Sequence, residues 1–164
     1  MEYLNLFRKL FENRIRYLVC GGLAVNIYGI PRMTADIDLL LDFNQVNITN
    51  FNKSVKELAY QPHAPISLEM LLDEEKRMDV VKNKNMIAYS FYNTLSDYMN
   101  LDVLIDAPFD FDHLWNNRET RKIEEVEVYI VALEDLIAMK KYANRNQDKQ
   151  DIIMLSKLKN IKPE

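Results

Sequence analysis

Apolar residues recur along the chain with two different spacings, and the spacings predict helices and strands. Apolar side chains that return every three or four positions predict helices over residues 2–14, 47–60, 67–81, 134–144 and 149–159. Short apolar or alternating runs predict strands over residues 17–20, 35–41, 87–92, 99–105 and 126–132. Shorter helices are expected at 23–28 and 112–117, and residues 61–65, which include two prolines, are expected to form a loop.

These elements predict an α+β fold in which helices flank a mixed β-sheet of four or five strands. The strands at 87–92 and 99–105 are separated by a short connection and are expected to pair as a hairpin. A chain of 164 residues is long enough for one domain. We expect a core over residues 1–132 and a C-terminal helical pair over residues 133–164 that packs on it, so that the two form one structural unit.

Composition excludes several classes of protein. The single cysteine, Cys20, excludes an internal disulfide framework and fits a reducing cytoplasm. Two histidines and one cysteine do not favour a structural zinc site. No apolar run is long enough to span a membrane, and the first residues lack the features of a signal peptide. We therefore expect a cytoplasmic protein.

Charge is distributed unevenly along the chain. The net charge of −4 argues against a general nucleic-acid coat protein. Residues 140–164 carry a local balance of +4, whereas residues 1–139 carry −8. The basic tail could be a solvated helix face, or it could form half of a site for an anion whose metal-binding half lies elsewhere.

The segment from Tyr17 to Asp42 contains all three glycines of the chain. Gly21 and Gly22 follow an expected strand and precede an expected helix. Glycine lets backbone N–H groups approach a phosphate closely, and the start of a helix attracts the same anion. A tight turn between a strand and a helix needs no ligand, however, so the glycine pair alone does not identify a binding site.

Acidic residues interrupt two of the apolar strands. Asp36 and Asp38 are two positions apart, so their side chains point to the same side of the strand. Two carboxylates in an apolar strand repel each other and are costly to desolvate unless a cation joins them. Asp102 lies between apolar neighbours on another expected strand, and Asp106, on the same strand face, is the other candidate for a third carboxylate. Magnesium prefers such oxygen ligands together with substrate phosphates.

Lys140 lies on or beside the apolar stripe of the expected 134–144 helix. One interpretation is a lysine whose stem packs while its ammonium reaches water. The other is a phosphate-binding lysine. Asp148 and Asp151 are interpreted as supporting residues, since Asp148 can cap the last helix or pair with Arg145 three positions earlier.

Together these residues resemble a known superfamily, the DNA polymerase beta-like nucleotidyltransferases. Its opening motif has a Gly-Gly or Gly-Ser pair and then a strand carrying D-x-[DE]; the matching residues here are Gly21-Gly22, Arg32 and Thr34-Ala35-Asp36-Ile37-Asp38. A later block is similar to the C-terminal motif of small prokaryotic nucleotidyltransferase-like proteins, including toxins of abortive-infection toxin–antitoxin systems. That block consists of residues 134–140, Ala143, Arg145, Asp148 and Asp151.

The resemblance implies a nucleotidyltransferase-like core and a magnesium-dependent enzyme. Such an enzyme moves a nucleoside monophosphate (NMP) from a nucleoside triphosphate (NTP), for example ATP, to an acceptor and releases pyrophosphate. It implies that Asp36, Asp38 and Asp102 are catalytic and hold Mg²⁺, with two ions expected, and that Asp102 also serves as a base. The nucleotide-binding residues implied are Gly21, Gly22, Arg32, Lys140 and Arg145.

The resemblance leaves the acceptor open among a protein, a tRNA and a small molecule. It implies a role in a toxin–antitoxin or phage-defence system, with a cognate antitoxin or toxin as partner. Gly22 replaces the serine common in the superfamily, and the chain ends soon after its second block. Other hypotheses are a weakly active or inactive nucleotide-binding or antitoxin-like module of the same fold, and an interaction protein without a ligand.

Overall fold

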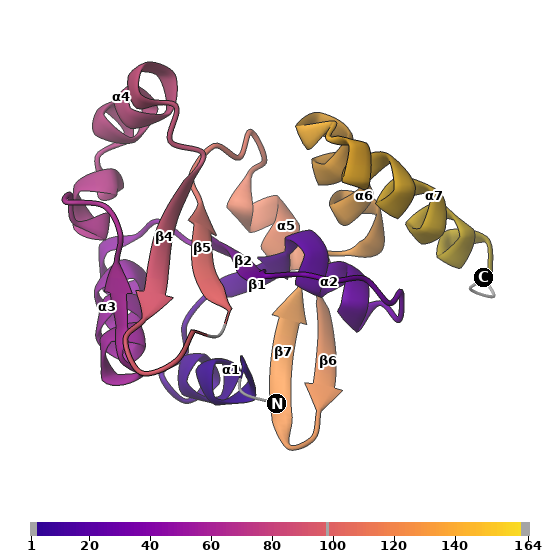
Figure 1. The fold of residues 1–164 in the computed structure, drawn as a ribbon, viewed down its shortest axis with the longest axis horizontal. Coiled ribbons are helices and arrows are strands. Elements are labelled where there is room, and N and C mark those ends of the chain that lie inside the picture. Colours follow the sequence, from indigo (N-terminus) through magenta and orange to yellow (C-terminus); the bar gives the residue numbers. More distant parts are fainter. Residues whose placement is uncertain (1–2, 98, 162–164) are drawn as a thin grey trace.

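Strands from both halves of the chain form one mixed sheet in a computed structural model, which describes residues 3–97 and 99–161. Among these residues the sheet has seven strands in the order β3-β4-β5-β2-β1-β7-β6 (Figure 1). Their bounds are β1 Tyr17–Cys20, β2 Asp36–Leu41, β3 Tyr60–Pro62, β4 Ala88–Asn93, β5 Asn100–Leu104, β6 Glu119–Ile123 and β7 Val126–Ile130.

Helices lie on both sides of this sheet, and the last two form an extension beside it (Figure 1). Residue 2 of the expected 2–14 helix and residues 162–164 of the expected extension lie outside the described residues. The bounds are α1 Tyr3–Glu12, α2 Gly21–Ile27, α3 Gln45–Glu57, a 3₁₀ helix Leu68–Leu72, α4 Glu74–Lys84, α5 Phe111–Asn117, α6 Leu133–Ala143 and α7 Asn146–Ile161.

The centre of the sheet is its most apolar part. All four residues of β1 are buried, and β1 lies between β2 and β7. A strand that is covered on both faces must be apolar throughout, which explains why the sequence shows a continuous run here instead of an alternation. On one face α1 packs against β7, while α2 contacts β2.

The strand register brings the acidic positions together. β1 and β2 are antiparallel with Cys20 opposite Asp38, and β2 and β5 are parallel with Asp38 opposite Asp102. β4 and β5 pair antiparallel, which confirms the expected hairpin. The α+β fold with a mixed sheet, flanking helices and a C-terminal helical pair is confirmed, and the central strands supply the frame of the site.

Several local predictions were wrong. The sheet has seven strands instead of four or five, because β3 forms within the expected loop and β6 was not expected at all. Both are edge strands, where a short length, a proline or alternating polar residues are tolerated. The expected 67–81 helix is broken at Asp73, whose side chain caps α4 by accepting a hydrogen bond from the backbone N–H of Lys76. The helix expected at 112–117 begins at Phe111, and Asp110 caps it by accepting a hydrogen bond from the backbone N–H of His113.

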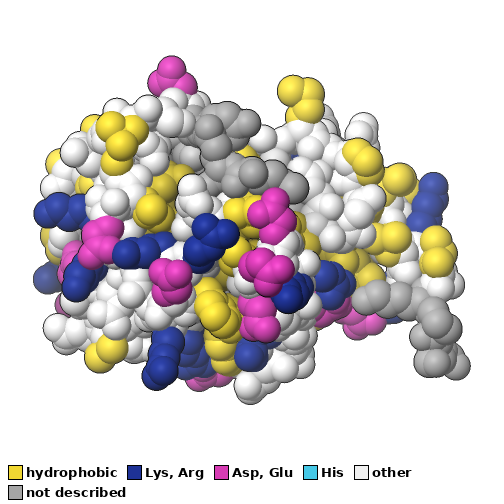
Figure 2. Space-filling view, turned by 90° about the horizontal axis from the view of Figure 1, so that it is seen from below, with side chains coloured by type: hydrophobic (Ala, Val, Ile, Leu, Met, Phe, Trp, Pro, Cys, Tyr) yellow, Lys and Arg dark blue, Asp and Glu magenta, His cyan; other side chains and the backbone are white. Residues whose placement is uncertain are grey.

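The surface does not gather charge of one sign on the face below α1 and the β6–β7 hairpin. Figure 2 shows acidic, basic and hydrophobic side chains interspersed there. Within the described residues, no helix has the length and apolar character needed to cross a membrane.

Candidate active site

A cleft of about 580 Å³ opens over the carboxylates of β2 and β5. Asp36 and Asp38 come from β2 and Asp102 from β5, and all three line the cleft. Because Asp38 lies directly opposite Asp102 and alternate residues share one face, the three side chains project from the same side of the sheet.

Burial, with repulsion from neighbouring carboxylates, disfavours the charged forms of Asp38 and Asp102. Burial, followed by the charges of Asp102 and Asp36, raises the pKa of Asp38 to about 6. Attraction from Arg145 and Lys140 acts in the opposite direction but is smaller. Burial also raises the pKa of Asp102, against a hydrogen bond from Ser90 that lowers it. The cleft therefore holds excess negative charge that a bound cation would neutralise.

The chemistry of these donors fits a hard divalent cation, because all of them are carboxylate oxygens. Their arrangement is not that of a closed metal cage: among the described residues, no group of three or more His, Cys, Asp or Glu side chains surrounds a common point. Magnesium usually keeps several waters and completes its coordination with substrate phosphates, so an open set of carboxylates is compatible with this metal.

Close approach of other residues explains why two glycines are needed at the start of α2. Gly21 has a φ of +62°, and a Cβ at this position would overlap the Asp38 carboxylate. A Cβ on Gly22 would lie 2.8 Å from Thr34 Oγ1 and 3.2 Å from the guanidinium carbon of Arg32. α2 begins on Gly21 itself, not at residue 23 as the sequence suggested. The glycines thus let Asp38, Thr34 and Arg32 pack against the first turn of α2.

A second group of charged residues joins α6 and α7 to the rest of the protein. The ammonium of Lys140 lies 3.2 Å from Asp148 Oδ1 and 2.8 Å from Asp151 Oδ2, and the three side chains are at most 4% exposed. Arg32, from the segment before β2, also pairs with Asp151. This ion network ties the segment that leads into the candidate site to the C-terminal helices.

Arg145 connects the ion network to the cleft. Its backbone N–H donates to Asp148 Oδ2 at 3.0 Å and its Nε donates to the same oxygen at 2.9 Å, so the expected pair at three residues' separation is confirmed. The side chain of Arg145 is 72% exposed and lines the cleft. Burial raises the pKa of Asp148, but hydrogen bonds from Arg145 and Lys140 outweigh it and lower that pKa overall.

The predicted site residues fall into two groups. Those that line the cleft are Gly21, Gly22, Arg32, Asp36, Asp38, Asp102, Asp106 and Arg145. Lys140 is buried in the ion network and does not line the cleft. Its ammonium therefore neither reaches water nor lies where it could contact a phosphate directly. Asp106 lies beyond the end of β5, four residues past Asp102, or about 13 Å along an extended chain.

Sequence reasoning missed the apolar side of the cleft. Phe109, Met139 and Tyr142 line it, whereas the aromatic residues of β4 do not. Tyr89 and Phe91 are buried in the core instead. Met139, Tyr142 and Ala143 share one helix face at three- and four-residue spacing, which was the available signal.

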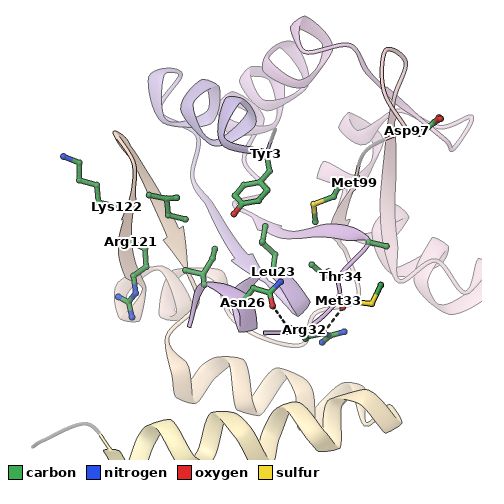
Figure 3. Close-up of a pocket in the computed structure, with 13 residues that line it drawn as sticks. Tyr3, Leu23, Asn26, Arg32, Met33, Thr34, Asp97, Met99, Arg121 and Lys122 are labelled. Carbon is green, nitrogen blue, oxygen red and sulfur yellow. Dashed lines mark hydrogen bonds between the residues drawn. The ribbon is translucent and has the colours of Figure 1, made fainter. Parts of the chain in front are cut away.

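A larger cavity of about 870 Å³ adjoins the cleft on the other side of the 32–35 segment. Figure 3 shows its lining, with Arg32, Met33 and Thr34 at the border and Arg121 and Lys122 on β6. The backbone N–H of Arg32 donates to Asn26 Oδ1, which fixes the segment between the two cavities. The larger cavity is lined by only one described carboxylate, Asp97, so the converging acidic groups identify the smaller cleft as the candidate site.

Comparison with solved structures places the fold among nucleotidyltransferase-like proteins. An antigenic nucleotidyltransferase-like protein from Paracoccidioides brasiliensis aligns over 96% of this chain and 77% of its own, with a TM-score of 0.60 and 20% identity. The structure of ANT(2")-Ia in complex with adenylyl-2"-tobramycin aligns over 92% of this chain and 83% of its own, with a TM-score of 0.56 and 13% identity. At these identities the likeness concerns the fold.

Comparison at the level of sequence identifies the family. No curated protein matches the chain. The family model described as nucleotidyl transferase AbiEii toxin, type IV TA system, matches residues 6–155, which include most of α1, every element from β1 to α6 and most of α7. The chain therefore belongs to the AbiEii family of nucleotidyltransferase toxins of type IV toxin–antitoxin systems.

Proposed function

We propose that this protein is a magnesium-dependent enzyme that transfers an NMP from an NTP to an acceptor molecule. The observation that carries the proposal is that Asp36, Asp38 and Asp102 project from one face of the sheet into one cleft, where burial and the neighbouring carboxylates raise the pKa of Asp38 despite the attraction of Arg145 and Lys140. A buried carboxylate with a purely structural role would be expected to have a cationic partner, as Asp148 and Asp151 on α7 have here.

Asp36, Asp38 and Asp102 are the residues that would hold magnesium, as one or two ions. When bound, the metal supplies positive charge that neutralises the phosphates and the charge developing in the transition state. Of the two candidates for the third carboxylate, the strand register favours Asp102, because it lies directly opposite Asp38. Asp106 lies past the end of β5.

The chain's own residues position the reactants. Asp102, with its raised pKa, accepts the proton of the acceptor hydroxyl as that oxygen attacks the α-phosphorus, and the bond to pyrophosphate breaks. Arg145 and Arg32 lie at the cleft wall, where their guanidinium groups can pair with phosphate oxygens. Gly21 and Gly22 let Asp38 and Arg32 pack against the start of α2, so that these side chains and the first turn of the helix would lie together beside the triphosphate. Most of the rate enhancement comes from this positioning and charge stabilisation.

In the cell we propose that the protein acts in the cytoplasm, where NTPs are available, as the toxin of a type IV toxin–antitoxin pair. The family supports a cognate antitoxin as partner. Its acceptor belongs to one of three classes: protein, tRNA or small molecule.

Transfer of label from α-³²P-NTPs tests the proposal, with a lysate of cells that lack the protein as the source of acceptors. We expect magnesium-dependent labelling that Asp36→Asn combined with Asp38→Asn abolishes. Asp97→Asn, which removes the carboxylate of the neighbouring cavity, should leave labelling intact. If the double variant labels as well as the wild type, the site assignment is wrong. Binding of Mg–NTP without transfer would instead support the nucleotide-binding module.

A further inference from the structure

The candidate cleft differs in chemical character along its length. At one end, beside the start of α2 at Gly21 and Gly22, Arg32 and Thr34 supply polar side chains. The other end is mostly apolar: Ile87, Leu104, Phe109, Met139 and Tyr142 line it, and Asp106 is the carboxylate among them.

The strand register shows that the three carboxylates separate these two ends. Cys20, the last residue of β1, lies opposite Asp38, and the chain continues from there into Gly21 on the Asp36 side. In the other direction, Leu104 lies two residues beyond Asp102 on β5, or about 7 Å along the strand. Ala88, the first residue of β4, pairs with Leu104, so the beginning of β4 borders the same apolar region.

Two aromatic rings from different elements form the wall of the apolar end. Phe109 lies in the connection after β5 and Tyr142 lies on α6, and their ring centroids are 6.1 Å apart with an interplanar angle of 84°. Tyr142 is 55% exposed and Ile87 is 61% exposed, so a large apolar surface faces the cleft instead of the core. An aromatic surface left open beside a polar, charged site favours a ligand with a planar, weakly polar part.

We infer that this apolar end is a nucleobase subsite, in which the base of the NTP stacks on the ring of Tyr142 and meets the nearly perpendicular ring of Phe109 edge-on. The inference rests on the proposed function and extends it to the base. A nucleoside triphosphate has a polyanionic end and a planar aromatic end, and the cleft offers the matching groups in the same order on either side of the carboxylates. Stacking on aromatic side chains tolerates different bases, because every base has a π-face.

Isothermal titration with two magnesium-bound probes, ATP and tripolyphosphate, separates the base from the phosphates. Tyr142→Ala is expected to weaken ATP binding about ten-fold, in line with the contribution of one base–aromatic stack, and to leave tripolyphosphate binding unchanged. Tyr142→Phe keeps the ring and should bind ATP like the wild type. Tyr92→Ala is the matched control, because Tyr92 is an exposed tyrosine of β4 that does not line the cleft.

The outcomes distinguish the subsite from the function on which it rests. If wild-type protein binds ATP no more tightly than tripolyphosphate, or if Tyr142→Ala binds ATP normally, the base subsite is refuted while a triphosphate site stands. Equal weakening of both probes by Tyr142→Ala also refutes it, since the ring would then support the whole cleft. Failure of the wild type to bind either probe overturns the proposed function itself.

Discussion

Two groups of aspartates in this protein lie in opposite electrostatic surroundings. On the sheet, burial and then the charges of Asp102 and Asp36 raise the pKa of Asp38 to about 6. On α7, Asp148 and Asp151 are almost fully buried, yet both contact the ammonium of Lys140. The pKa of Asp148 is lowered, because its hydrogen bonds outweigh burial.

The contrast separates a structural role from a chemical one. A buried carboxylate with a cationic partner is satisfied by the fold, and the ion network holds α6 and α7 against the 32–35 segment. The charge of a partly buried carboxylate beside two others is balanced only when a bound cation supplies positive charge. The difference lies not in the residue type but in whether the chain itself provides the counter-charge.

The largest effect should follow from breaking the ion network. Lys140→Met leaves Asp148 and Asp151 buried without their ammonium, and we expect the free energy of unfolding to fall by about 3–5 kcal/mol. Denaturant unfolding at pH 7 measures the change. Lys159→Met is the control, since Lys159 pairs with Glu134 at the exposed surface and its loss should change the free energy of unfolding far less than Lys140→Met. A loss as small as the control's would mean that the network is not structural.

A substitution on the sheet is expected to raise the free energy of unfolding instead of lowering it. Asp38→Asn removes a charge that burial and repulsion disfavour, so metal-free protein should gain about 2–3 kcal/mol of stability at pH 7, since one pKa unit corresponds to about 1.4 kcal/mol. The gain should depend on pH. Because the folded-state pKa of Asp38 is raised from 3.8 to about 6, its protonation stabilises the fold below about pH 4, and this contribution is lost as the pH rises through 6.

Unfolding measured from pH 3.5 to pH 7.5 in a chelator therefore distinguishes the variant from the wild type. The gain for Asp38→Asn should be small at the acidic end and full at the neutral end. A destabilised variant at pH 7 would contradict the picture of Asp38 as a residue that weakens the metal-free fold.

The smallest change in stability is expected at Arg145, which connects the ion network to the cleft. Arg145→Gln removes a largely exposed partner of Asp148 and should cost about 0.5–1 kcal/mol at pH 7. The lowered pKa of Asp148 gives stability that is present above about pH 4 and is lost as the pH falls through the folded-state pKa. The variant should therefore lose stability at a higher pH than the wild type during acid unfolding. An unchanged acid transition would show that Lys140 alone sets the behaviour of Asp148.

Much of the site's frame was predictable from local sequence patterns. Alternation along a strand predicted that Asp36 and Asp38 point the same way, and the apolar run around Asp102 predicted a strand there, although its pairing with β2 was not predicted. The edge strand β6 was missed, because Glu119–Ile123 contains charged residues and little apolar signal. Edge strands need only one paired neighbour, so their sequences are weakly constrained.

Contacts between distant segments were the part that sequence patterns could not predict. The position of Lys140 on an apolar stripe predicted an inward-facing stem, but burial of its ammonium depends on Asp148 and Asp151 arriving from the next helix. The pairing of Phe109 with Tyr142 depends in the same way on where α6 lies relative to the connection that follows β5. Such arrangements follow from tertiary packing, which no periodicity encodes.

A carboxyl-detected NMR titration tests the central contrast most directly, because it reports Asp38 and Asp148 in one sample. In metal-free protein we expect Asp38 to titrate with a pKa of about 6 and Asp148 below its usual range. Added magnesium should lower the pKa of Asp38 and leave that of Asp148 unchanged. Ordinary pKa values for both residues, or a magnesium response that is the same at the two sites, would contradict the account.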